Sequence, residues 1–170
     1  MFVVERSSSS SKPDFYRGLN DQLRALLADE TDGLANAANT AALLYEALPD
    51  LNWVGFYFLR DAALLLGPFQ GKVACIRIAL GRGVCGTAAG ERRTVIVPDV
   101  HAFPGHIACD SASRSEIVVP LLRDGAVLGV LDLDSPLLGR FDQDDADGLA
   151  TTVELLLARS DMSRLISRPA

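Results

Sequence analysis

Residues 115–134 read SEIVVPLLRDGAVLGVLDLD, which is two apolar runs rich in β-branched residues with a turn between them. The predicted strands are Ser115 to Leu122 and Ala126 to Asp134. They flank Asp124-Gly125, a dipeptide typical of tight β-hairpins. Because strands joined by so short a turn run antiparallel, this segment predicts an antiparallel sheet.

A second hairpin is predicted upstream of the first. The aromatic, β-rich run Asn52 to Leu59 is followed by a turn at Arg60-Asp61 and by the apolar run Ala63 to Gly67. Val73 to Leu80 and Thr94 to Val97 are two further candidate strands. The sequence thus predicts about six strands in a mainly antiparallel sheet.

Helices are predicted at both ends of the chain. Apolar residues recur at helical spacing from Pro13 to Ala28, and Thr31-Asp32 supplies a cap for a second helix that Pro49 ends. Phe141-Asp142 opens the last helix, and the glycine-flanked segment Gly81 to Gly90 is a short one. Together these elements predict an α+β fold in which N-terminal helices and a C-terminal helix pack on the sheet.

The length and composition predict one domain. The chain has 170 residues, of which 49% are hydrophobic, so its core needs no disulfide or metal for stability. We expect residues 13–166 to form this single domain. Residues 1–12 contain five consecutive serines and no long apolar segment, so we expect a disordered tail rather than a secretory signal.

The charge balance excludes several classes of partner. The net charge is −6, and no basic stripe suits a nucleic acid. The acidic residues are scattered, except for four aspartates at the expected start of the last helix, Asp142, Asp144, Asp145 and Asp147. No run of eighteen apolar residues suggests a membrane span. Three cysteines are an odd number for a secreted disulfide scaffold, so we expect the reducing cytoplasm.

The connection between residues 98 and 113 is long for a compact domain, and such loops are often functional. It contains both histidines of the chain, His101 and His106, and it contains Cys109 in the run FPGHIACD. Packing explains a cysteine in such a loop poorly. Thiol chemistry needs an accessible sulfur with a proton donor nearby, and Glu116 follows seven residues later.

The other two cysteines leave more than one interpretation open. Cys75 lies in a strand-like run and Cys85 in a short glycine-flanked segment, so either could be a small buried core residue. Either could instead resolve an oxidised Cys109. A zinc site that adds His101 and His106 to these thiols is a competing use, although no Cys-x-x-Cys pair is present.

Three carboxylates are expected to converge. Asp132 and Asp134 are two residues apart on a predicted strand, so they share one face with Cβ atoms about 7 Å apart. Leu128 and Val130 should share that face, which indicates that the pair borders a buried region. Glu116 belongs to the adjacent strand. Such convergence raises the pKa of at least one carboxyl, so one could donate a proton while another holds a substrate ammonium.

Alternation also divides the aromatic strand into two faces. We expect Val54, Phe56 and Phe58 to pack in the core. Trp53 and Tyr57 share the other face and could wall a site for a methyl-sulfur group, because aromatic rings pack well on sulfur. Ordinary core packing is the alternative for Trp53.

From about Leu51 to Ser135, the chain resembles the free methionine-(R)-sulfoxide reductases, small stand-alone GAF-domain proteins. The stretches that carry the resemblance are GRGVCGTA (81–88), VPDV (97–100), FPGHIACD (103–110), SEIVVP (115–120) and LDLDS (131–135). All three cysteines of the family have a counterpart in this chain. The resemblance implies a GAF-like fold and the reduction of free L-methionine-(R)-S-oxide to methionine, with no cofactor and no metal.

The resemblance also implies roles for the thiols and partners for the chain. Cys109 would be the catalytic thiol, Cys75 the resolving thiol and Cys85 a second recycling candidate. Cys109 would attack the sulfoxide sulfur and become a sulfenic acid, which condenses with Cys75 to a disulfide. Thioredoxin would reduce this disulfide, and a homodimer is expected.

The remaining roles concern the substrate. Glu116 would protonate the sulfoxide oxygen, and Trp53 would lie near the substrate methyl. Asp132 and Asp134 would hold the ammonium, while backbone N–H groups near Ile107 and Ala108 would take the carboxylate.

Two other functions remain possible on the sequence alone. One is a non-catalytic GAF domain that binds a small ligand or senses redox state. Such sensors are usually joined to an output domain such as a kinase or cyclase, and we expect none within 170 residues. The other is a zinc-binding structural module.

Overall fold

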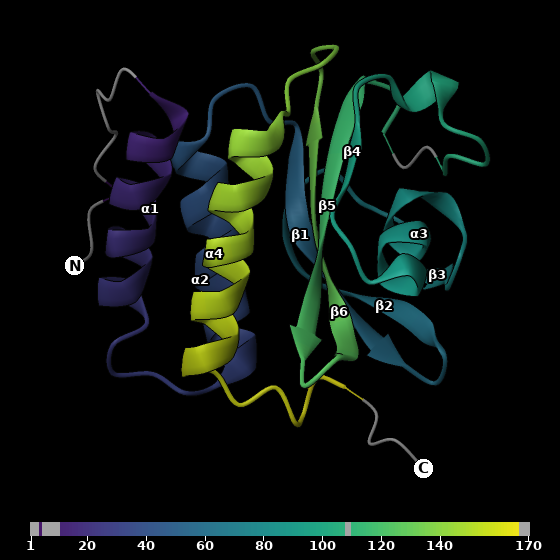
Figure 1. The fold of residues 1–170 in the computed structure, drawn as a ribbon. Helices are drawn as coiled ribbons and strands as arrows, with labels where there is room; N and C mark the ends of the chain where they lie inside the picture. Colours follow the sequence, from purple (N-terminus) through teal and green to yellow (C-terminus); the bar gives the residue numbers. More distant parts are fainter. Residues whose placement is uncertain (1–3, 5–10, 108–109, 167–170) are drawn as a thin grey trace.

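The computed structural model describes residues 4, 11–107 and 110–166 (Figure 1). Six strands form one antiparallel sheet in the order β3-β2-β1-β6-β5-β4. The strands are β1 (Trp53–Arg60), β2 (Ala63–Gly71), β3 (Arg77–Ala79), β4 (Val95–Val97), β5 (Ser115–Arg123) and β6 (Ala126–Ser135). β5 and β6 are the hairpin that the sequence predicts. Asp124 and Gly125 at its turn have φ values of 52° and 77°, as the tight hairpin turn requires.

Helices cover both faces of this sheet, but unequally. α2 (Gly33–Ala47) and α4 (Gln143–Arg159) pack on one face, and α1 (Lys12–Leu26) packs against them. α3 (Gly83–Glu91) lies on the opposite face, where the connection from β4 to β5 also runs (Figure 1). This arrangement confirms the predicted α+β fold. None of the described helices is both long and apolar enough to cross a bilayer.

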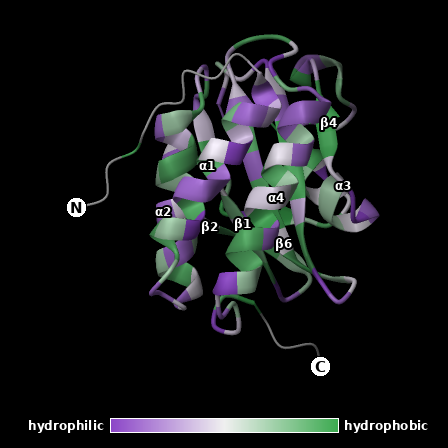
Figure 2. Ribbon diagram, turned by 60° about the vertical axis from the view of Figure 1, so that its left-hand side comes forward, coloured by the Kyte–Doolittle hydropathy of each residue, from purple (hydrophilic) through white to green (hydrophobic). Residues whose placement is uncertain are grey.

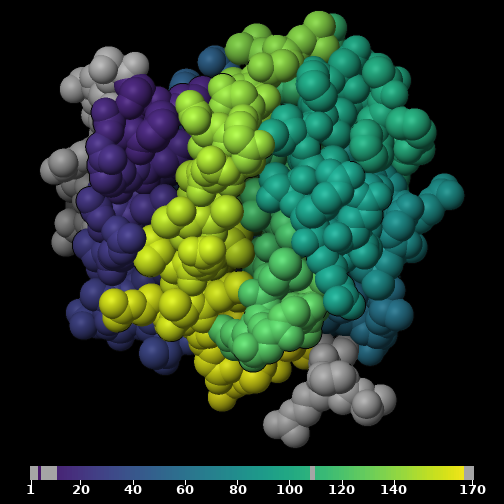
Figure 3. Space-filling model, viewed as in Figure 1, coloured from purple at the N-terminus to yellow at the C-terminus, as the bar shows by residue number. Residues whose placement is uncertain are grey.

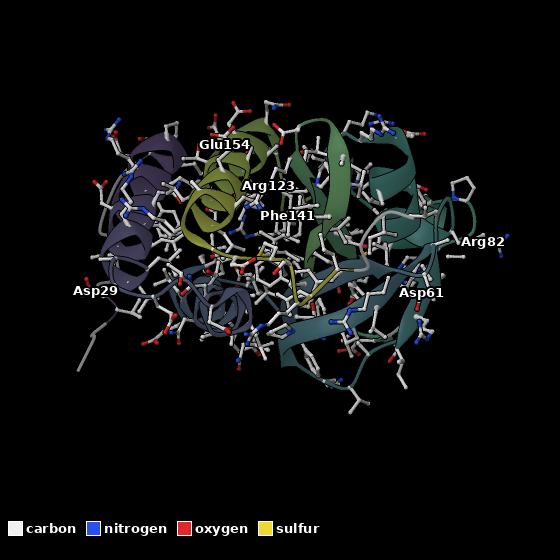
Figure 4. All side chains as sticks on the ribbon, turned by 90° about the horizontal axis from the view of Figure 1, so that it is seen from below. Asp29, Asp61, Arg82, Arg123, Phe141 and Glu154 are labelled. Atoms are coloured by element: carbon white, nitrogen blue, oxygen red, sulfur yellow. The ribbon has the colours of Figure 1, made fainter. Side chains whose placement is uncertain are left out.

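The helix layer is amphipathic. Figure 2 shows hydrophobic and hydrophilic residues on each of its helices, as is usual for helices with one face on a core. In the space-filling view, α4 fills the space between α1 and the part of the chain that is coloured teal (Figure 3). Seen from below, the side chain of Phe141, which is 5% exposed, lies between the helices and the sheet (Figure 4).

Caps fix where the helices begin. Asp32 Oδ1 accepts hydrogen bonds from the backbone N–H groups of Leu34 and Ala35, which confirms its predicted role. Asp142 caps α4 and forms a capping box with Asp145. The acidic cluster therefore does begin the last helix.

The first helix begins at Lys12, one residue before the predicted Pro13 and within the segment expected to be a tail. Ser11 Oγ accepts from the N–H of Asp14 and is the N-cap of α1, and Lys12 is the first residue of that helix. Lys12 Nζ lies 2.8 Å from Asp142 Oδ2 and also pairs with Asp145. Capping and ion pairing thus draw these two residues into the fold, while most of residues 1–10 lies outside the described part of the chain.

The two faces of β1 separate the core into two parts. Val54, Phe56 and Phe58 belong to the apolar cluster beneath the helix layer, as the alternation predicts. Trp53 and Tyr57 belong to a second cluster on the opposite face, beside α3. The face of β1 that carries Trp53 is therefore the one available for a site.

One alternation prediction is wrong. Leu128 does not share a face with the acidic residues of β6, because it packs in the cluster beneath the helices. The register explains this difference: Leu121 pairs with Gly129 and Leu122 with Val127, so Leu128 is an extra residue on its strand. Such a β-bulge reverses the alternation on one side of it. Val130, beyond the bulge, lies on the α3 side as predicted.

The third strand is also shorter than predicted. β3 covers only Arg77–Ala79, which pair with Leu65, Leu64 and Ala63 of β2. The apolar residues before it are not buried, since Val73 is 87% exposed and Ile76 is 69% exposed. Residues 72–76 therefore form a connection on the surface, and Cys75 lies in it.

Candidate active site

A pocket lies on the face of the sheet that is opposite the three-helix layer. β1, β5 and β6 form its floor, and α3 and the connection of residues 98–114 form its walls. Its lining includes Trp53, Tyr57, Ala74, Arg82, Cys85, His106, Ile107, Asp110, Ser113, Glu116, Asp132 and Asp134. Seven of the ten residues that the sequence singles out are in this set: Trp53, Tyr57, Cys85, Ile107, Glu116, Asp132 and Asp134.

Of the remaining three predicted site residues, the structure describes only Cys75, which is not among the described lining residues. Ala108 and Cys109 lie outside the described part of the chain. Cys75 is partly buried and packs against the cluster beneath the pocket, and its neighbour Ala74 is a lining residue. The roles of these three residues therefore stay predictions.

Strand register brings the carboxylates together. Glu116 of β5 lies directly opposite Asp134 of β6, and Asp134 lies opposite Trp53 of β1. Asp132 is opposite Gly55 on one side and Val118 on the other. Directly opposed residues of an antiparallel pair have Cβ atoms about 5 Å apart. The three acids thus form one group on neighbouring strands, as their spacing predicts.

Burial keeps these carboxyls from being fully charged. Glu116 is 5% exposed and Asp132 is 6% exposed. Burial raises the pKa of Asp132 from 3.8 to about 7, and burial together with the charges of Asp132 and Asp134 raises the pKa of Glu116 well above 4.5. The pKa of Asp134 is raised by burial and by Asp132. Because each charge disfavours the next, the group holds at least one proton at neutral pH.

A side-chain hydrogen bond joins Glu116 and Asp132. A neutral Glu116 can donate to Asp132, an interaction that lowers the pKa of Asp132 and raises that of Glu116. Asp132 Oδ1 is buried and has no hydrogen-bond partner among the described residues. The protonation of Asp132 and that of Glu116 are therefore linked.

Cys85 is held in this group as a neutral thiol. It is the third residue of α3, and its Sγ donates a hydrogen bond to Asp132 Oδ2 at 3.2 Å. Burial, and after it the charges of Asp132 and Glu116, raises the pKa of Cys85 well above its usual range. A thiol of this kind is a poor nucleophile at neutral pH, because the thiolate is the reactive form.

The aromatic wall is built by stacking. The Trp53 ring lies 5.9 Å from the Tyr57 ring and 5.4 Å from the Phe69 ring, with interplanar angles of 28° and 16°. Trp53 Nε1 donates to the carbonyl oxygen of Lys72 at 3.0 Å. Gly55 leaves space for this ring, since a Cβ atom at that position would lie 2.6 Å from Trp53 Cη2. Trp53 is thus both buried and part of the pocket wall.

Several pocket residues, His106, Asp110 and Ser113, have no role in the reduction that the sequence predicts. His106 Nε2 lies 3.6 Å from Glu116 Oε2, and burial followed by the charge of His101 lowers the pKa of His106. Asp110 and Ser113 lie on the same connection, beyond the undescribed pair. The run FPGHIACD contains His106 and Asp110, but its irregular pattern gives no hint of which side chains turn inward.

The structure also bears on the zinc hypothesis. Within residues 11–107 and 110–166, the donor atoms close enough to share one ion belong to Cys85, Glu116 and Asp132, within 4.8 Å of one another. Neither His101 nor His106 belongs to this group. The histidine ligands of that hypothesis are therefore not supported.

The sequence of this chain matches a known family model and several known proteins. The GAF domain family model matches residues 35–157. The free methionine-R-sulfoxide reductase of Escherichia coli K12 is 52% identical over 163 residues, which cover 94% of this chain and 99% of that protein. The chain belongs to the free methionine-R-sulfoxide reductase family of GAF-domain proteins.

Members of this family from other organisms agree in sequence and structure. The free methionine-R-sulfoxide reductase of Saccharomyces cerevisiae is 42% identical, with 90% of this chain and 89% of the yeast protein covered. The X-ray structure of the Neisseria meningitidis enzyme in complex with its substrate is 50% identical and superimposes with a TM-score of 0.90. That match covers 97% of this chain and 99% of the Neisseria chain. The resemblance that the sequence motifs indicate is thus confirmed.

Proposed function

We propose that this protein reduces free L-methionine-(R)-S-oxide to methionine. The observation that carries the proposal is the group formed by Glu116, Asp132 and Asp134 beside the Trp53 ring, in a chain about half identical to reductases of this name. A buried acid can supply a proton, ionised carboxylates can hold an ammonium, and an aromatic wall can hold a methyl-sulfur group.

Recognition of a free amino acid needs groups for both of its backbone charges. Asp132 and Asp134 take the ammonium, and the buried Oδ1 of Asp132 is an acceptor that has no hydrogen-bond partner among the described residues. Backbone N–H groups near Ile107 and Ala108 take the carboxylate. A methionine sulfoxide within a peptide has lost both charges and is therefore rejected.

The chemistry follows from the electrophilic sulfur of a sulfoxide. Cys109 attacks this sulfur as a thiolate while Glu116 gives its proton to the sulfoxide oxygen. The oxygen passes to Cys109 as the S–O bond of the substrate breaks, which leaves methionine and a sulfenic acid. Only one epimer can direct its oxygen to Glu116 and its methyl to Trp53 at the same time.

Recycling needs a second thiol and an external reductant. The Cys75 thiol attacks the Cys109 sulfenic acid, so that a disulfide forms and water leaves. A dithiol protein of the thioredoxin class reduces the disulfide and becomes oxidised itself. Cys85 is the second recycling candidate. We place the protein in the reducing cytoplasm and expect it to act as a homodimer.

The test is an assay with each free epimer. We expect methionine to form from the (R)-sulfoxide with dithiothreitol or thioredoxin as reductant, and not from the (S)-sulfoxide or from a peptide that contains the sulfoxide. Cys109→Ser should abolish turnover. Binding of the (R)-sulfoxide without any methionine would instead support the alternative, a non-catalytic GAF sensor for a small ligand or for redox state.

A further inference from the structure

Two thiol-bearing segments that are distant in sequence are joined by an ion pair. Lys72 follows the last residue of β2 and precedes Cys75 by three positions, while Asp110 directly follows Cys109. Lys72 Nζ lies 3.1 Å from Asp110 Oδ1. The pair therefore connects the segment of residues 72–76 to the connection of residues 98–114.

Asp110 is firmly held although it lies in a loop. Its side chain is only 7% exposed. The N–H of Ala112 donates to Oδ1 at 2.9 Å, and Asn52 Nδ2 donates to Oδ2 at 3.2 Å. These hydrogen bonds, with that of Lys72, lower the pKa of Asp110, so the carboxylate is charged at neutral pH.

Lys72 is fixed at both of its ends. Its carbonyl oxygen accepts the hydrogen bond from Trp53 Nε1, and its side chain reaches Asp110. Gly71 before it has a φ of 125°, and a Cβ atom there would lie 2.7 Å from Trp53 Cδ1. A glycine is thus required for the chain to turn this closely past the aromatic wall.

The same network continues into the acidic group. Asn52 Nδ2 also donates to Ser113 Oγ at 2.9 Å, and Ser113 forms a hydrogen bond with Asp134. One chain of contacts therefore joins five residues in this order: Lys72, Asp110, Asn52, Ser113 and Asp134. It runs from the surface to the floor of the pocket.

We propose that Lys72 and Asp110 are positioning residues for the step that resolves the oxidised thiol. The inference rests on the proposed function. After methionine has left, the Cys75 thiol must reach the Cys109 sulfenic acid, so that the S–S bond forms as the S–O bond breaks and water departs. Two groups held near each other react far faster than two groups on independently moving segments. The ion pair supplies this restraint.

The exposure of Lys72 allows its role to be separated from folding. Its side chain is 69% exposed, and exposed ion pairs contribute only about 0–1 kcal/mol to stability. Lys72→Met should therefore fold and attack the substrate normally. It should affect only the step in which the two segments must meet.

The experiment is a single turnover of the full-length reduced protein with excess (R)-sulfoxide and no reductant. Rapid quenching gives the rate of methionine release, and mass spectrometry counts sulfenic acid, trapped with dimedone, against disulfide. For Lys72→Met we expect methionine release at the wild-type rate and disulfide formation slowed by up to about fivefold, which is what an ion pair of about 1 kcal/mol can supply. Lys72→Arg should restore the rate, because it keeps the cation.

Arg77→Met is the matched control, since it removes a cation from an exposed side chain two residues after Cys75. It should leave both rates unchanged. The inference is overturned if Lys72→Met forms the disulfide at the wild-type rate, if it slows both steps alike, or if Arg77→Met is as slow. A wild-type protein that releases no methionine would instead overturn the proposed function, so the two failures are distinguishable.

Discussion

Glu116 and Asp134 are directly opposed register partners on β5 and β6, so two carboxyl groups meet where like charges repel. Asp132 adds a third acid beside them, with its pKa raised to about 7. The sheet tolerates this group because protonation removes part of its charge. In the proposed function a substrate ammonium replaces this proton, so the same acids that lower the stability of the fold would bind the substrate.

The first prediction concerns the pH dependence of stability. The folded-state pKa of Asp132 is raised above its unfolded value, so between about pH 4 and pH 7 the folded protein binds more protons than the unfolded chain. The contribution of Asp132 to the free energy of unfolding is fully present below this window and is lost as the pH rises through 7. The loss is at most about 4 kcal/mol, because one pKa unit is about 1.4 kcal/mol.

Guanidinium unfolding at a series of pH values measures this effect. Asp132→Asn should flatten the decline in stability between pH 5 and pH 8, since the amide does not ionise. Asp124→Asn, at the exposed hairpin turn, is the control and should keep the wild-type slope. An Asp132→Asn protein with an unchanged slope would contradict the assignment of burial as the cause of the raised pKa.

The second prediction concerns Glu116 as the proton donor. Glu116→Gln keeps the size of the side chain but removes its proton, so kcat should fall by roughly 10²- to 10⁴-fold. KM should change little, because the proposed function assigns the substrate ammonium to Asp132 and Asp134. Steady-state kinetics with the (R)-sulfoxide measure both constants, and Glu154→Gln on the exposed face of α4 is the control. A rise in KM with a normal kcat would show that Glu116 binds the substrate rather than protonating it.

The sequence predicts the parts of this site that depend on regular periodicity. Two-residue alternation places Asp132, Asp134 and Trp53 on one side of the sheet. The turn at Asp124-Gly125 predicts the hairpin, but its register alone would pair Glu116 with Leu133, and the extra residue Leu128 brings Glu116 opposite Asp134. Alternation fails at Leu128, because a bulge depends on the register of two strands and leaves no mark in one strand's pattern.

The contacts of the loops could not be predicted. The ion pair between Lys72 and Asp110 joins residues 38 positions apart, and no periodic signal links them. The burial of Cys85 depends on how α3 packs against β5 and β6, which its short glycine-rich sequence does not specify. His106 was recognised only as a metal ligand, since its distance from Glu116 follows from the path of an irregular connection.

The third prediction separates the roles of the cysteines. Cys75→Ser should release about one methionine per chain and then stall with thioredoxin, because no disulfide forms. Cys85→Ser should continue to turn over, since a hydroxyl can still donate to Asp132 and the buried, neutral Cys85 thiol is a poor nucleophile. Counting methionine per chain by chromatography distinguishes the two variants. Sustained turnover by Cys75→Ser together with stalling by Cys85→Ser would show that Cys85, and not Cys75, is the resolving thiol.

The fourth prediction concerns the space that Gly55 leaves for the aromatic wall. A Cβ atom at this position would lie 2.4 Å from Phe69 Cβ and 2.6 Å from Trp53 Cη2, so Gly55→Ala must displace one of these rings. We expect Gly55→Ala to lower the free energy of unfolding by about 1–3 kcal/mol and to raise KM for the sulfoxide. Gly18→Ala in α1 is the matched control: it meets no atom within 4 Å and should stabilise the helix by about 1 kcal/mol. Denaturant unfolding and Trp53 fluorescence measure both changes. If Gly55→Ala were as stable as the wild type with an unchanged tryptophan spectrum, the close packing of Trp53 over Gly55 would be wrong.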